Sequence, residues 1–199
     1  MGFTRKTLVI FLAATLTLST AVATEKSPVP VSELSALRKQ LGWSRDYLKR
    51  CNAGRPLNEI YELIGEQKWF EVTKQSEMWL EQCPIDIRIH TFAAIGFSEL
   101  GITERSNYHT DAWQTLMDDI FASGKGTRTS PVEVISVSEE YDVLFILRAK
   151  LKRQRVVQGE VAMDEIEFTT QNGKAGKLYF NPAAHLQRLI ENRAFDDMP

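Results

Sequence analysis

The residues best suited to chemistry are Glu139, Glu140 and Tyr141, with Asp164 further along the chain. Adjacent residues of a helix point about 100° apart, so Glu139 and Glu140 cannot both serve one reacting atom, as the two carboxylates of a glycoside hydrolase do. One of them could instead pair with Asp164 or Glu167 and form a general acid–base couple beside Tyr141. The pattern favours a structural role, in which the two glutamates stabilise a helix N-terminus by about 0.3–1 kcal/mol each.

Two glycine-containing runs match catalytic motifs only in part. The run 124–127 (Gly-Lys-Gly-Thr) follows a predicted helix, and no glycine stands where a phosphate-binding loop needs its first one. This run is therefore predicted to end a helix and form a turn. Residues 96–98 (Gly-Phe-Ser) are not a nucleophile elbow, because Leu100 takes the place of the second glycine.

The three histidines, His90, His109 and His185, are scattered singly along the chain. None has a partner at the spacing of a zinc-binding motif. We therefore expect no metal site and no cofactor, and we expect His90 to pack in a groove between helices.

Two cysteines, Cys51 and Cys83, each stand at the end of a predicted helix beside apolar residues. If they pair, the loop that they close stabilises the fold by about 3.5–4 kcal/mol. A pair of buried free thiols fits the same positions. The sequence leaves both alternatives open.

Residues 1–23 have the pattern of an export signal. A basic pair at 5–6 precedes an uncharged, largely apolar run at 7–22, and a small-residue cleavage signal ends at Ala23. The run is short and rich in threonine, whereas a membrane span needs about 20 predominantly apolar residues. We therefore expect a mature protein that begins at Thr24 and is periplasmic or secreted, without stable membrane insertion. The alternative is an uncleaved N-terminal anchor.

The charge balance of the chain is close to neutral. It has 24 basic and 26 acidic residues, a formal net charge of −2. Neither a basic stripe nor a basic amphipathic face is present, so nucleic acid and membrane surfaces are not expected partners.

The region 24–126 is predicted to be helical, because its apolar residues recur at intervals of three and four. Gln67 and Gly101 fall where the turns of tetratricopeptide-like helix pairs would be. Such a turn prefers glycine, and Gln67 departs from this preference. An irregular helical bundle is the alternative. The expected helices cover 34–41, 47–51, 57–64, 69–83, 89–100 and 112–121.

The region 127–199 is predicted to hold a small antiparallel sheet with helices against one face, and to form one continuous globular unit with the helical region. Ser138 is expected to cap a helix that runs to Leu147. Asn172-Gly173 predicts a hairpin with a type I′ turn, and a last helix follows Asn181-Pro182. The expected strands cover 132–137, 154–158, 161–170 and 177–180. The fold class is thus α+β, a helical layer packed with a small sheet.

Three runs carry a resemblance to a known family: 123–126 (Ser-Gly-Lys-Gly), 134–141 (Val-Ile-Ser-Val-Ser-Glu-Glu-Tyr) and 179–181 (Tyr-Phe-Asn). Gln154 and Asp164 stand between them at suitable distances. The chain thereby resembles the family called domain of unknown function 4919, a set of mostly exported bacterial proteins. One departure is the lysine of the first run, where an acidic residue is expected. The resemblance implies no activity.

These observations predict an exported bacterial protein that binds a protein or peptide in the cell envelope without catalysis. The layout of paired helices motivates this expectation, since stacked helix pairs present concave binding surfaces. The alternatives are a cofactor-independent hydrolase that uses a carboxylate where helix and sheet meet, and a secreted inhibitor or immunity-type protein.

Overall fold

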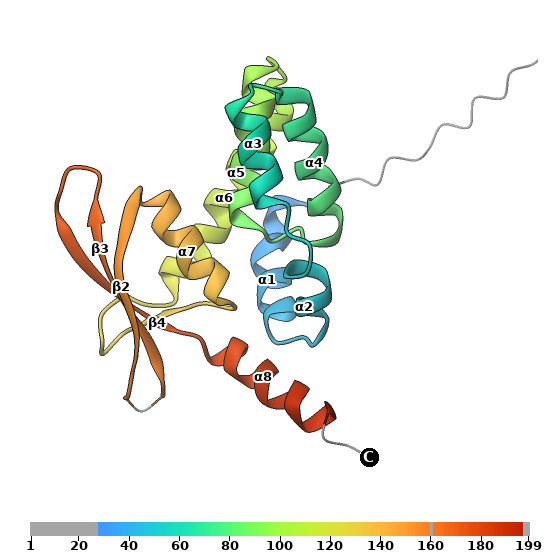
Figure 1. The fold of residues 1–199 in the computed structure, drawn as a ribbon. Helices are drawn as coiled ribbons and strands as arrows, with labels where there is room; N and C mark the ends of the chain where they lie inside the picture. The colour runs from blue at the N-terminus through green and yellow to red at the C-terminus, as the bar shows by residue number, and fades with distance from the viewer. Residues whose placement is uncertain (1–27, 160, 197–199) are drawn as a thin grey trace, which may run out of the picture.

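Helices form the N-terminal part of the chain, and the C-terminal part combines four strands with two further helices, as the α+β prediction requires (Figure 1). The computed structural model describes residues 28–159 and 161–196. The expected signal at 1–23 and its cleavage point between Ala23 and Thr24 lie outside these ranges. Within them, no helix is both long and apolar enough to span a membrane.

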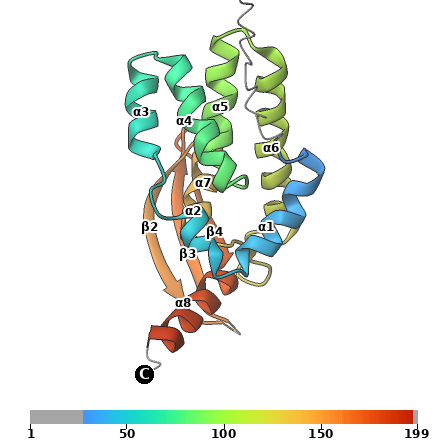
Figure 2. The same ribbon diagram turned by 90° about the vertical axis from the view of Figure 1, so that its right-hand side faces the viewer.

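The helical part consists of a short entry segment and two helix hairpins. Its elements are η1 (Val31–Glu33), α1 (Leu34–Gly42), α2 (Asp46–Cys51), α3 (Leu57–Gly65), α4 (Trp69–Gln82), α5 (Ile87–Glu99) and α6 (Thr103–Ala122). In Figure 2 the hairpins α3–α4 and α5–α6 stand in front of the sheet. Helix α6 begins well before the predicted residue 112. Its first half is polar and therefore shows no apolar periodicity, and it places Tyr108 and His109 near α4 and α5.

The two hairpins turn in the same way. Gln67 (φ 56°) and Gly101 (φ 72°) both adopt the left-handed conformation, and they are one tetratricopeptide period (about 34 residues) apart. Each turn closes with the same pair of hydrogen bonds, Lys68 N–H to Leu63 and Gln67 N–H to Ile64 in the first turn. This pattern is the Schellman motif, which usually places glycine where Gln67 stands.

The sheet is mixed, whereas an antiparallel sheet was predicted. Its strands are β1 (Val132–Glu133), β2 (Ala149–Val157), β3 (Met163–Thr170) and β4 (Ala175–Asn181), in the order β1-β4-β3-β2. β2, β3 and β4 are antiparallel neighbours, but β1 runs parallel to β4, with Val132 opposite Phe180. A two-residue strand carries too little pattern to reveal its partner or its direction.

The β3–β4 hairpin forms where Asn172-Gly173 predicts it, but the predicted type I′ turn is wrong. Such a turn needs positive φ at both central residues, and only Gly173 (φ 81°) has it. Gly173 N–H donates to Thr170 O, and Thr170 N–H donates to Lys174 O, so the loop has three residues. This is the common turn in which a left-handed glycine follows two ordinary turn residues.

One hydrophobic core joins the helices to the sheet. It includes Leu34 of α1, Ile87 of α5, Ile120 of α6 and Ile166 of β3, all nearly inaccessible to solvent. Helix α7 (Val137–Ile146) contacts both α5 and β2, so it lies between the two layers (Figure 1). Helix α8 (Ala183–Asp196) follows β4.

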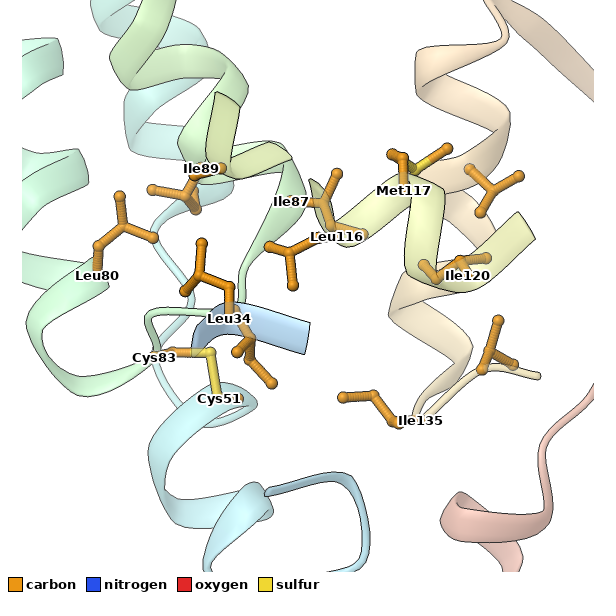
Figure 3. Close-up of a cluster of buried hydrophobic side chains, with 14 of the residues drawn as sticks. Leu34, Cys51, Leu80, Cys83, Ile87, Ile89, Leu116, Met117, Ile120 and Ile135 are labelled. Carbon is orange, nitrogen blue, oxygen red and sulfur yellow. A yellow bond between two sulfur atoms is a disulfide. The ribbon is translucent and has the colours of Figure 1, made fainter. Parts of the chain in front are cut away.

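The sulfur atoms of Cys51 and Cys83 are bonded, with their Cα atoms 5.0 Å apart. The bond links the end of α2 to the residue that follows α4, beside Leu34 and Leu80 (Figure 3). It therefore ties the entry segment to the first hairpin at the edge of the core.

Candidate functional site

The first turn of α7 carries the carboxylates that the sequence singled out. Ser136 caps this helix: it has extended backbone angles, and its hydroxyl accepts from Glu139 N–H at 3.2 Å. The predicted cap, Ser138, already lies inside the helix, so that prediction is wrong by one half-turn. Glu139 and Glu140 thus stand in the first turn, where the helix dipole favours negative charge.

Glu139 faces the helical layer. Its two oxygens accept from Arg38 Nε and Nη2, each at 2.7 Å, and one of them also accepts from Ile135 N–H at 2.9 Å. Arg38 in turn donates to Asp119 at 2.8 Å. Arg38 and Glu139 are both buried. A forked pair of this kind is fully occupied in holding α1 against α7.

Glu140 faces the opposite way, toward the sheet. It is fully buried, and its Oε2 accepts from Gln154 Nε2 at 3.1 Å. Burial, together with the nearby carboxyl group of Asp164, raises the pKa of Glu140 to about 9. Tyr141 O–H donates to the other end of the same amide, Gln154 Oε1, at 2.5 Å. We call these four residues, Glu140, Tyr141, Gln154 and Asp164, the junction cluster.

The junction cluster fulfils part of what an acid–base site requires. The structure brings Glu140, Tyr141 and Asp164 together, and it directs Glu139 elsewhere. A carboxyl group that keeps its proton at neutral pH can act as a general acid. However, the group must reach the substrate, and Glu140 has no exposed surface. Tyr141 is the member with substantial exposure, 38 %.

A second charged cluster surrounds Asp86, and sequence reasoning missed it. Asp86 caps α5 and accepts from Trp79 Nε1 at 2.8 Å and from Arg55 Nη2 at 2.6 Å. Arg55 also bonds Asp142 of α7 at 2.8 Å, and Arg88 pairs with Asp142 at 2.7 Å. The sequence did carry one signal for this site: Asp86 stands three positions before Ile89, where the apolar stripe of the predicted helix begins, which is typical of an N-cap. This cluster is buried and largely paired, so we assign it to the fold.

The cavities of the described part of the chain include the following three. The first, of about 230 Å³, lies between α4, α5 and α6. The second, of about 390 Å³, lies between α1, α6, β1 and α8, beside the fully paired Arg38. The third, of about 10 Å³, is a gap beside the Asp86 cluster. Glu140, Tyr141 and Asp164 line none of these three.

The first cavity, which we call the hairpin cavity, has apolar walls and a polar end. Val29, Leu80 and Pro84 contribute apolar surface, and Glu77, Arg105 and His109 contribute polar groups. Tyr108 lines it as well, and its hydroxyl donates to Val29 O at 2.8 Å, which fixes the segment that enters η1.

Two histidines that stand singly in the sequence meet at the polar end of the hairpin cavity. His90 Nδ1 and His109 Nδ1 are 2.9 Å apart, and His90 Nε2 is 3.0 Å from Pro84 O. His109 Nε2 has no hydrogen-bond partner in the described part of the chain, and Glu77 Oε1 lies 3.5 Å away. Burial lowers the pKa of His90 to about 4 and, with Arg105, lowers the pKa of His109 to about 3.

His185 lies apart from this pair, on α8 near Asp164. Within residues 28–159 and 161–196, no three His, Cys, Asp or Glu side chains converge as a metal site would require. His90 does pack between helices, but its pairing with His109 joins positions 19 residues apart on different helices. No local spacing rule reveals such a pair.

Comparison with known proteins gives one match. A family model described as "Domain of unknown function (DUF4919)" matches residues 47–191. The match includes α7, the junction cluster and the hairpin cavity from α4 to α6. No curated protein and no solved structure matches the chain.

Proposed function

This chain belongs to the DUF4919 family, and on that premise we propose that it is an exported, non-catalytic protein that binds a peptide or protein partner in the cell envelope. The family description assigns no activity, so the proposal is argued from the sites themselves. The observation that carries it is the hairpin cavity, where a buried ring nitrogen that has no partner among the described residues lies beside apolar walls.

Two features support export. The N-terminal pattern that ends at Ala23 is that of a cleaved signal. The bond between Cys51 and Cys83 suits an oxidising compartment, because disulfides persist in the periplasm and outside the cell but are rare in the cytosol. N-terminal sequencing of protein recovered from the periplasm or the medium is expected to begin at Thr24. A product in the cytosol that begins at Met1 contradicts export.

Binding without catalysis is favoured by the contrast between the two candidate sites. In the junction cluster, the fully buried Glu140 lines none of the three cavities described above. The hairpin cavity, in contrast, is open, and His109 Nε2 at its polar end lacks a hydrogen-bond partner among the described residues. A buried polar group without a partner is costly, so a site of this kind gains when a ligand supplies the missing bond.

Photocrosslinking from defined positions tests the proposal. A photoreactive residue at Glu81, which is exposed at the rim of the hairpin cavity, is expected to capture a discrete envelope protein. The matched control is the same residue at Lys152, exposed on β2. The captured protein is then purified and titrated against the full chain by calorimetry. Equal capture from both positions, or no binding between the purified proteins, contradicts the proposal.

A cofactor-independent hydrolase is the second candidate, because the raised pKa of Glu140 resembles that of a general acid. Glu140→Gln is expected to abolish any hydrolysis that the purified protein shows on ester, peptide or glycoside substrates. Hydrolysis that survives this substitution excludes the junction cluster as its source. An inhibitor or immunity-type role corresponds to one outcome of the crosslinking, in which the captured partner is an enzyme that loses activity in the complex.

A further inference from the structure

A chain of hydrogen bonds fixes which nitrogens of the histidine pair carry protons. Pro84 O can only accept, so His90 Nε2 must be the donor across their 3.0 Å contact. Both rings are neutral near pH 7, since burial lowers both pKa values well below it. His90 Nδ1 is then a bare acceptor, and His109 Nδ1 must carry the proton that bridges their 2.9 Å contact.

The same logic leaves His109 Nε2 as a bare acceptor. It is buried, with 2 % of the residue exposed, and no donor of the described chain reaches it. Glu77 Oε1 lies 3.5 Å from it and also accepts only. Arg105 donates to Glu77, and no hydrogen bond joins it to His109. Two acceptors therefore face each other with no proton between them, and this arrangement calls for a donor that residues 28–159 and 161–196 do not supply.

The surroundings indicate what kind of donor fits. Glu77 and Glu81 supply two negative charges to the cavity and Arg105 supplies one positive charge, so a cation is favoured. The walls of Val29, Leu80 and Pro84 suit an apolar stem. A volume of about 230 Å³ lies below the roughly 300–1,000 Å³ of pockets that hold whole cofactors or drug-sized ligands, so one side chain or a small amine is the appropriate size.

We propose that the hairpin cavity binds a primary ammonium group on an apolar stem, namely a lysine side chain of the partner, which donates N–H bonds to His109 Nε2 and to the Glu77 carboxylate. This inference rests on the proposed binding function and names the chemistry that the site recognises. An ammonium group has three donors and no acceptor, so it can satisfy both facing acceptors at once. Its four-carbon stem packs along apolar surface while the charged head meets polar groups.

The test uses the full mature protein with ¹⁵N-labelled histidine. Nα-acetyl-lysine methylamide is titrated in and the His109 Nε2 resonance is followed by NMR. The norleucine analogue has a similar stem without the ammonium group, and n-butylamine has the ammonium group without a peptide backbone. We expect saturable shifts of His109 Nε2 with the lysine probe and at least tenfold weaker binding of the norleucine probe. If n-butylamine binds and the lysine probe does not, the site is assigned to free amines and the lysine assignment is overturned.

Two variants of matched chemistry complete the test. Glu77→Gln removes one acceptor charge and is expected to weaken the lysine probe at least tenfold, whereas Glu99→Gln, exposed at the end of α5, leaves binding unchanged. Circular dichroism and the backbone NMR spectrum establish that both variants are folded. Equal binding of lysine and norleucine probes, or no shift at His109 with any probe, overturns the inference.

The inference and the proposed function can fail separately. A partner captured at Glu81 that binds Glu77→Gln as tightly as the unchanged protein overturns the ammonium site and leaves the binding function intact. Conversely, saturable lysine binding in a protein that captures no partner supports the site and contradicts the proposed function.

Discussion

Replacing Glu140 with glutamine should make the protein more stable at neutral pH, although the residue is fully buried. Glutamine is nearly the same size, its carbonyl oxygen can accept from Gln154 Nε2 as the carboxyl does, and its amide can donate toward Asp164. The substitution therefore preserves the contacts of the junction cluster and removes only the ability to ionise.

The magnitude follows from the raised pKa of Glu140. Its pKa is about 9 in the folded protein against 4.5 as the reference value, so the folded state holds a proton that the unfolded chain releases above pH 4.5. Stability contributed by the protonated carboxyl is complete below pH 4.5 and is lost progressively as the pH rises toward 9. At pH 7.5 the loss spans about three pH units, or about 4 kcal/mol at about 1.4 kcal/mol per unit.

The assay is urea unfolding of both proteins at 25 °C across pH 4.5–8.5. We expect Glu140→Gln to exceed the unchanged protein by about 2–4 kcal/mol at pH 7.5, and the difference to fall below about 1 kcal/mol at pH 4.5. Glu62→Gln, exposed on α3, is the control and should show no pH-dependent difference. A Glu140→Gln effect that is the same at every pH, or a variant that is less stable at pH 7.5, refutes the reasoning.

Three further predictions concern the fold. Protein denatured without reductant should show no free thiol, and replacing Cys51 and Cys83 together with serine should lower the free energy of unfolding in urea by about 4 kcal/mol; labelling of two thiols contradicts the pairing. Arg38→Met leaves the buried Glu139 carboxylate without its cation and should cost about 3–5 kcal/mol in the same assay, so a loss under 1 kcal/mol speaks against the ion pair. Ser136→Ala should cost about 1 kcal/mol, whereas Ser138→Ala should cost under 0.5 kcal/mol; the reverse order in thermal melts restores Ser138 as the cap.

Much of the secondary structure was predictable because it depends on local pattern. The apolar spacing of α4, which places Val72, Trp79 and Leu80 in the core, indicates the helix and its face without tertiary information. The β3–β4 hairpin follows from one glycine flanked by strand residues. The first half of α6 lacks an apolar stripe, so the residues that face the hairpin cavity gave no periodic signal.

The candidate sites were less predictable because their members are far apart in the sequence. Arg38 and Glu139 are 101 positions apart, and the direction of each carboxylate in the first turn of α7 depends on what that helix packs against. The helix geometry did predict that Glu139 and Glu140 diverge. Which one pairs with Asp164 could be decided only by the sheet, and the histidine pair only by the packing of α5 against α6.

The divergence of these two glutamates bears on how the chain can be divided. Glu139 binds a guanidinium group of α1 and Glu140 meets the sheet, so consecutive residues of one helix anchor it to opposite neighbours. A fragment that stops at residue 126 would separate Arg38 from Glu139 and Arg55 from Asp142, and would leave the buried carboxylates of the C-terminal piece without counter-ions. Neither piece should therefore be produced as a well-behaved module, and a gene fusion or duplication that carries one half alone would be expected to fail.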